Sequence, residues 1–147
     1  MISQAVSEML GAKYKLGNMS VADGFDCFSY VPWFYRRIGA YVPEASSDGS
    51  ASLSNYLDAF AKDPEAAKIL MWRELRRLTE KVANPNLFVP ADLFVIHKRG
   101  QDPTTAIYLG AGNMLSCDVR IGIVVFPKVM LRSDKLEVLR PCLKQSR

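Results

Sequence analysis

The order of the local patterns constrains this chain most, because helical patterns come first and short strand patterns follow them. Five apolar segments, at 93–97, 104–109, 114–117, 121–126 and 136–139, are separated by Gly, Pro, Asn and Asp, as strands separated by turns are. Helix and strand patterns do not alternate, which argues against a doubly wound parallel sheet. The order therefore predicts an α+β domain with an antiparallel sheet.

Two helices are expected in the first forty residues. Apolar residues recur at helical spacing over 2–10, and Gly11 closes that helix. A second helix is expected over 27–38, with a glycine just past its end. Pro32 lies inside the second helix, where its missing N–H should kink the helix or delay its start.

Two further helices are expected before the strands begin. Ser52 or Ser54 can cap a short helix that runs through Phe60. The run Asp63-Pro64-Glu65 is a strong start signal, with a capping Asp, Pro at the first helical position and an acid in the first turn. The helix after it is expected to continue to 84–86, where Asn-Pro-Asn ends it.

One compact domain accounts for the whole chain, which has 147 residues of which 49% are hydrophobic. We expect it to carry a helical insertion at about 52–82 and a basic C-terminal tail at about 128–147. The cationic excess of the tail equals the net charge of the chain, +4. Such a tail can bind nucleic acid or an acidic protein, or remain solvated. No segment interleaves aromatic and basic residues, which argues against nucleic acid.

Several other classes of protein are excluded by the sequence. No apolar run approaches the ~18 residues of a membrane helix. The N-terminus has neither the basic start nor the apolar core of a secretion signal, so we expect synthesis in the cytoplasm. Cys27, Cys117 and Cys142 are odd in number and widely spaced, which indicates neither a disulfide framework nor a zinc site. We expect no metal and no cofactor.

The segment around Cys27 carries the strongest chemical signal. Asp26 is placed to cap the helix that is expected to begin at Cys27. A thiol at a helix N-terminus lies at the positive end of the helix dipole, which favours the nucleophilic thiolate. The alternative is a small buried cysteine that starts a core helix. The one histidine of the chain, His97, is either the base for this thiol or a packing residue.

Four short segments resemble NlpC-type cysteine peptidases, which cleave peptide bonds in bacterial cell-wall stem peptides. Tyr14-Lys15-Leu16-Gly17 followed by Phe25-Asp26-Cys27 is similar to the nucleophile segment of that family. Residues 89–94, 104–110 and 114–116 are similar to its later strands, in the same order. The resemblance implies a papain-like fold with N-terminal helices packed on a small antiparallel sheet. It also implies that Cys27 is the nucleophile and that Tyr14 steadies the developing oxyanion.

The sequence departs from the family pattern at the positions that matter for catalysis. The position of the catalytic histidine is Thr104, and the position of the residue that orients it is Ser116. Phe28 is bulky where substrate would approach. A threonine hydroxyl does not take up a proton near neutral pH, as an imidazole does. If the hairpin pairs His97 directly opposite Thr104, the imidazole could reach Cys27, whereas a slip of one residue would turn it to the other face.

Two functions follow from these observations. The first is a catalytically impaired peptidase fold that acts as a structural or interaction module, because folds outlast functions. Similar domains occur in phage tail tips, so we expect a virion location, other assembly proteins as partners and peptidoglycan as a further ligand. The alternative is an active cysteine endopeptidase or amidase that cleaves peptidoglycan stem peptides with Cys27. The missing histidine favours the first.

Overall fold

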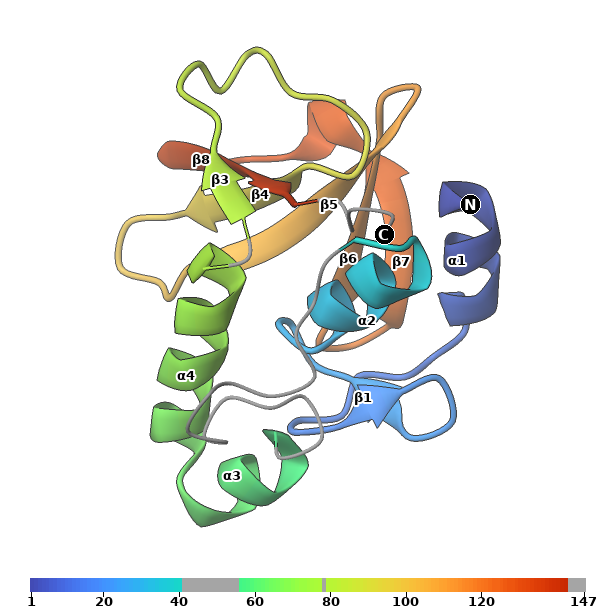
Figure 1. The fold of residues 1–147 in the computed structure, drawn as a ribbon, viewed down its shortest axis with the longest axis vertical. Coiled ribbons are helices and arrows are strands. Elements are labelled where there is room, and N and C mark those ends of the chain that lie inside the picture. Colours follow the sequence, from blue (N-terminus) through green and yellow to red (C-terminus); the bar gives the residue numbers. More distant parts are fainter. Residues whose placement is uncertain (41–55, 78, 143–147) are drawn as a thin grey trace, which may run out of the picture.

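A computed structural model describes residues 1–40, 56–77 and 79–142 of the chain. Six antiparallel strands form the main sheet, in the order β3-β8-β4-β5-β6-β7, and helices lie against it (Figure 1). Its strands are β3 (Thr79–Lys81), β4 (Leu93–His97), β5 (Thr104–Gly110), β6 (Asn113–Asp118), β7 (Gly122–Pro127) and β8 (Lys135–Pro141). The predicted α+β class and the five predicted strands, now β4 to β8, are confirmed.

The helices precede the sheet along the chain. They are α1 (Ile2–Met9), α2 (Tyr30–Arg37), α3 (Tyr56–Lys62) and α4 (Pro64–Arg77). A small ribbon, β1 (Met19–Ser20) paired with β2 (Gly24–Phe25), lies between α1 and α2. No described helix combines the length and the apolar composition needed to cross a bilayer.

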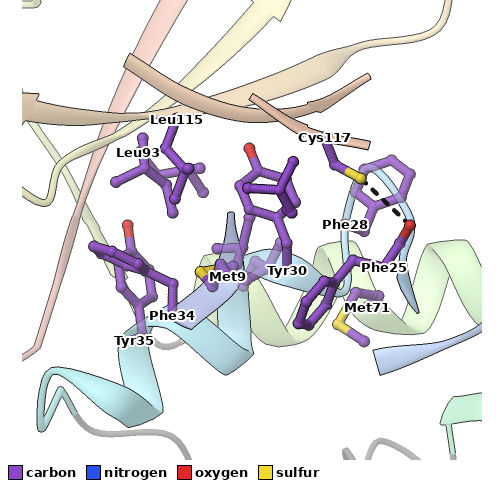
Figure 2. Packing of buried hydrophobic residues seen from close by; sticks show 14 of the residues in the cluster. Met9, Phe25, Phe28, Tyr30, Phe34, Tyr35, Met71, Leu93, Leu115 and Cys117 are labelled. Atoms are coloured by element: carbon purple, nitrogen blue, oxygen red, sulfur yellow. Dashed lines mark hydrogen bonds between the residues drawn. The ribbon is translucent and has the colours of Figure 1, made fainter. Parts of the chain in front are cut away.

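Apolar side chains alternate between the two faces of the sheet, as the period of a strand requires. Along β4, Leu93 and Val95 pack into the main core with the helices, while Phe94 and Ile96 pack into a second cluster on the opposite face. Figure 2 shows part of the main core, where aromatic side chains from the segment 25–35 meet Leu93 and Leu115 of the sheet. The helices therefore cover the face that carries the candidate site.

Two expectations about the helices need correction, and one falls on residues that the structure does not describe. The helix predicted to start at Cys27 begins at Tyr30, because Pro32 is tolerated only in a first turn, where its N–H is not needed. The helix predicted to reach 84–86 ends at Arg77, and Thr79–Lys81 instead pairs with β8. The predicted caps at 52 and 54 lie outside the described residues.

The predicted basic tail contributes to the sheet. Its segment Lys135–Pro141 is β8, which lies between β3 and β4. Arg140 on β8 forms two hydrogen bonds with the buried carboxylate of Asp92, at 3.0 and 2.9 Å. Part of the positive charge in this segment is therefore used to hold the fold together.

Candidate active site

The turn that presents Cys27 is built around the buried carboxylate of Asp26. Its Oδ1 accepts hydrogen bonds from the backbone N–H groups of Phe28 and Ser29, at 2.9 and 2.8 Å. Its Oδ2 accepts one from Gly17, at 3.0 Å. The Asp26 N–H in turn donates to the Ser29 hydroxyl, at 2.9 Å. Asp26 therefore caps the turn that precedes α2 and ties it to the loop at Gly17.

The Cys27 thiol is not activated by this environment. Burial raises the pKa of Cys27 to about 11, and the neighbouring Asp26 carboxylate acts in the same direction. Lys68, the backbone and the Tyr14 hydroxyl favour the thiolate but do not outweigh burial. The expected benefit of a helix N-terminus is weak, because α2 begins three residues later and the dipole effect fades within one turn. The thiol is therefore protonated at neutral pH.

Tyr14 lies beside Cys27, as the family resemblance implied. Both side chains line the same pocket, and burial, followed by the charge of Cys27, raises the pKa of Tyr14 to about 12. Both groups are neutral near pH 7. Cys27 and Tyr14 thus form a pair of neutral groups in the lining of one pocket.

A pocket of about 260 Å³ opens above Cys27, and α4 forms one of its walls. Lys68, Ile69 and Trp72 of α4 line it together with Phe28. The rings of Phe28 and Trp72 meet edge to face with centroids 4.9 Å apart. The bulky Phe28 that the sequence placed on the substrate path is therefore fixed against α4 and is only 5% exposed.

The side chain that approaches Cys27 from the sheet is Thr105, which the sequence analysis missed. Its hydroxyl donates to the Cys27 carbonyl at 2.8 Å and is 2.8 Å from the hydroxyl of Tyr30. Ser116 donates to the Thr105 carbonyl at 2.9 Å. Thr104 is exposed and lies at the edge of the pocket. Strand alternation was the available signal, because Thr105 is two residues before the core residue Ile107.

Of the two registers that the sequence left open, the structure does not adopt the one that places His97 opposite Thr104. Ile96 pairs with Thr104 instead. The Nε2 atom of His97 lies 2.9 Å from Glu137 Oε1 on β8. Because β8 and β5 flank β4 on opposite sides, this contact directs the imidazole away from the strand that faces Cys27. Cys27 therefore has no imidazole partner, since the chain contains one histidine.

Glu137 contacts Arg76 as well as His97. The guanidinium of Arg76 on α4 forms two hydrogen bonds with the Glu137 carboxylate, at 3.1 and 3.2 Å. Arg76, more than His97, lowers the pKa of Glu137 to about 2. Arg76, Glu137 and His97 therefore join α4 to the strands β8 and β4 of the sheet.

The comparison with protein families identifies this architecture. Residues 11–131 match the model of the NlpC/P60 family. The chain belongs to the NlpC/P60 family. No curated protein matches the sequence. The predicted papain-like fold is confirmed by the likeness to solved NlpC/P60 domains.

Three of those solved structures show the range of the likeness. NlpC2 from Trichomonas vaginalis is 14% identical with a TM-score of 0.62, and the match covers 98% of this chain and 46% of NlpC2. The P60 domain of antigen MAP1204 from M. avium subspecies paratuberculosis is 16% identical with a TM-score of 0.57. The match covers 98% of this chain and 93% of that domain. The NlpC/p60 domain of the peptidoglycan hydrolase SagA is 16% identical with a TM-score of 0.56. The match covers 93% of this chain and 94% of that domain.

At these identities the likeness establishes the fold alone. The NlpC/P60 chain described here spans less than half the length of NlpC2, of which the match covers 46%. The activity of this chain therefore has to be argued from its own residues.

Proposed function

We propose that this NlpC/P60 domain is catalytically impaired and acts as a structural or interaction module. The observation that carries the proposal is the absence of an imidazole at Cys27, because His97 is held by Glu137 on another strand. General-base catalysis typically contributes 10²–10⁴-fold to a rate. The Thr105 hydroxyl on the facing strand cannot act as a general base in place of an imidazole.

The setting that we propose is a phage tail or a similar virion assembly, with other proteins of that assembly as partners. The support is the resemblance to NlpC-like domains of phage tail tips, together with a fold kept after its base was lost. Recovery of the protein with purified particles is the expected result. Recovery only as free protein, never with particles, would remove this part of the proposal.

Peptidoglycan is a further ligand that we propose for the domain. SagA, which shares the fold, is a peptidoglycan hydrolase. A domain that keeps the fold and loses the base could retain affinity for stem peptides without cleaving them. Sedimentation with purified sacculi would test this directly, because a protein that stays in the supernatant does not bind.

An active cysteine endopeptidase remains the second candidate, because Cys27 and Tyr14 still lie side by side at the pocket. This function requires cleavage of stem peptides that is lost on Cys27→Ala. Incubation with sacculi from pH 5 to 9, followed by analysis of the released fragments, separates the two candidates. We expect no release by the wild type above the level of Cys27→Ala.

The reactivity of Cys27 tests the main proposal. The wild type and His97→Ala would be treated with iodoacetamide from pH 6 to 11, and each cysteine followed by peptide mass analysis. Since burial raises the pKa of Cys27 to about 11, we expect its rate to rise up to the highest pH used, equally in both proteins. A fast rate below pH 7 that disappears in His97→Ala would reveal a thiolate–imidazole pair and overturn the proposal.

A further inference from the structure

We infer that the pocket above Cys27 binds one large apolar side chain of a protein partner, with a basic residue next to it. This inference rests on the proposed function and names the site and the partner class of the interaction module. It differs from cleavage of a stem peptide, because the side chain is held as an anchor and no bond is broken.

The size and walls of the pocket favour a single bulky side chain. Its volume of about 260 Å³ exceeds that of a ~150 Å³ cavity that takes up benzene. It lies below the ~300–1,000 Å³ that is usual for drug-sized ligands. Its apolar wall residues come from the loop after α1, the turn after β2, and α4, and they are Leu16, Phe28, Ile69 and Trp72.

The bottom of the pocket carries no charge at neutral pH. Cys27 and Tyr14 lie there, and burial holds the pKa values of both groups at about 11 and 12. In an active cysteine peptidase the same place would hold a thiolate and an imidazolium, which an apolar group would have to desolvate. Loss of the ion pair therefore makes the pocket more favourable for an apolar side chain.

Exposed apolar residues stand at the mouth of the pocket. Ile69 on α4 is 66% exposed, and Leu16 in the loop after α1 is 51% exposed. A partner segment whose side chain fills the pocket would also cover these two residues. Burial of an anchor with a surrounding apolar contact is the pattern of protein–protein hot spots.

The charged residues around the mouth of the pocket determine which type of residue is favoured next to the apolar anchor side chain. Glu65 and Lys68 form an ion pair at 3.4 Å and so offset one another. Asp102 also lines the pocket, and in the described part of the chain its carboxylate has no ion-pair partner. The remaining negative charge favours a lysine or arginine beside the anchor, as charge complementarity at an interface rim does.

Short peptides test the inference with the whole chain of 147 residues. Acetyl-Trp-Lys-amide, acetyl-Ala-Lys-amide and acetyl-Trp-Glu-amide would be titrated into the ¹⁵N-labelled protein and followed by NMR. We expect the Trp-Lys peptide to bind with a Kd of about 1 mM, to shift the Trp72 indole signal, and to bind several-fold more tightly than the Trp-Glu peptide. The Ala-Lys peptide should not shift it. Binding of the Ala-Lys peptide as tightly as the Trp-Lys peptide would overturn the inference.

A matched pair of variants locates the site. Ile69→Arg places a charge at the mouth, and Val129→Arg places one at a remote position that is 82% exposed. Both residues are exposed, so both variants should fold, which their NMR spectra would verify. We expect Ile69→Arg to weaken binding of the Trp-Lys peptide at least tenfold and Val129→Arg to leave it unchanged. Equal binding by both variants would exclude this pocket.

Asp102→Asn tests the basic neighbour. We expect this variant to bind the Trp-Lys and Trp-Glu peptides about equally, because it removes the charge and keeps the apolar walls. An unchanged preference for Lys would overturn the assignment of the basic residue. A stem tripeptide that binds in this pocket while the Trp-Lys peptide does not would overturn the anchor.

The outcomes separate this inference from the proposed function. Cleavage of sacculi that depends on Cys27 would contradict the loss of catalysis, whatever the peptides do. No cleavage together with no binding of the Trp-Lys peptide would leave the catalytic impairment intact and overturn the anchor pocket.

Discussion

Thr105 connects the sheet to Cys27 through the backbone. Its hydroxyl donates to the Cys27 carbonyl, so the hydroxyl of Tyr30 donates to Thr105 in turn. Both Thr105 and Tyr30 are buried, and Tyr30 also interacts with Ser116. This set of neutral hydrogen bonds holds the Cys27 turn against β5.

Replacing Thr105 with valine should therefore reduce stability. Valine fills a similar volume but leaves the Cys27 carbonyl without its buried donor, at a cost of about 1–3 kcal/mol in the free energy of unfolding. Thr104→Val is the control, because Thr104 is exposed and should change the value by less than about 0.5 kcal/mol. Urea denaturation measures both. Equal effects of the two substitutions would show that Thr105 does not hold the turn.

At this scale the sequence predicted the residues that are adjacent along the chain. Asp26 was recognised as a cap, and Tyr14 was recognised beside Cys27 from the family motif. Thr105 and His97 were not placed, because their positions depend on strand pairing. A shift of one residue decides which side chain points at the site, and no local pattern fixes that shift.

Glu137 is the residue through which α4, β4 and β8 are joined. Its side chain is 10% exposed, and Arg76 and His97 contact it from neighbouring elements. Arg76 is the main reason that the pKa of Glu137 falls from 4.5 to about 2. A carboxyl group whose pKa is lowered on folding stabilises the fold at pH values above its ordinary pKa. This stabilisation is lost as the pH falls through the pKa of the folded state.

Glu137→Gln should therefore destabilise the protein at pH 7 and much less at pH 2. We expect a deficit of roughly 1.5–3 kcal/mol at pH 7, as for hydrogen bonds to charged groups. This deficit should shrink between about pH 4.5 and 2, the range between the ordinary and folded pKa values. Thermal unfolding across this range measures it. Glu8→Gln, which breaks the exposed pair with Arg37, is the control and should show a smaller dependence.

A deficit that stays constant down to pH 2 would contradict this assignment, because the stabilisation would then not come from the ionised carboxylate.

At the scale of elements, segments with a clear period were predicted well and boundaries were not. The strands β4 to β8 were located because alternation and turn residues mark them. The strand Thr79–Lys81 was missed because the apolar pattern of α4 continues through it along the sequence, and only its pairing with β8 makes it a strand. Ala91 has a positive φ of 78°, a conformation that costs free energy in a residue with a Cβ atom and that propensity does not predict.

The described residues share one main core, and α4 belongs to it. Ala67, Met71 and Leu75 of α4 are buried in the same cluster as Phe25 and the inner face of the sheet. Figure 2 shows Met71 beside Phe25, on the side of the core away from Leu93. The Arg76–Glu137 pair adds a second attachment at the far end of the helix. The helix α4 is therefore part of the main core, although the sequence analysis expected it to belong to an insertion.

Shared burial predicts that α4 unfolds together with the sheet. Native-state hydrogen exchange at increasing urea would measure the opening free energy of each amide. We expect the amides of Met71 and Leu75 to exchange within about 1 kcal/mol of those in β5, as members of one cooperative unit do. If α4 opened at a much lower free energy, the wall of the Cys27 pocket would be a movable cover, and the pocket would admit larger ligands than one side chain. Common exchange energies would instead establish a pocket of fixed shape, which is the condition that a single apolar anchor requires.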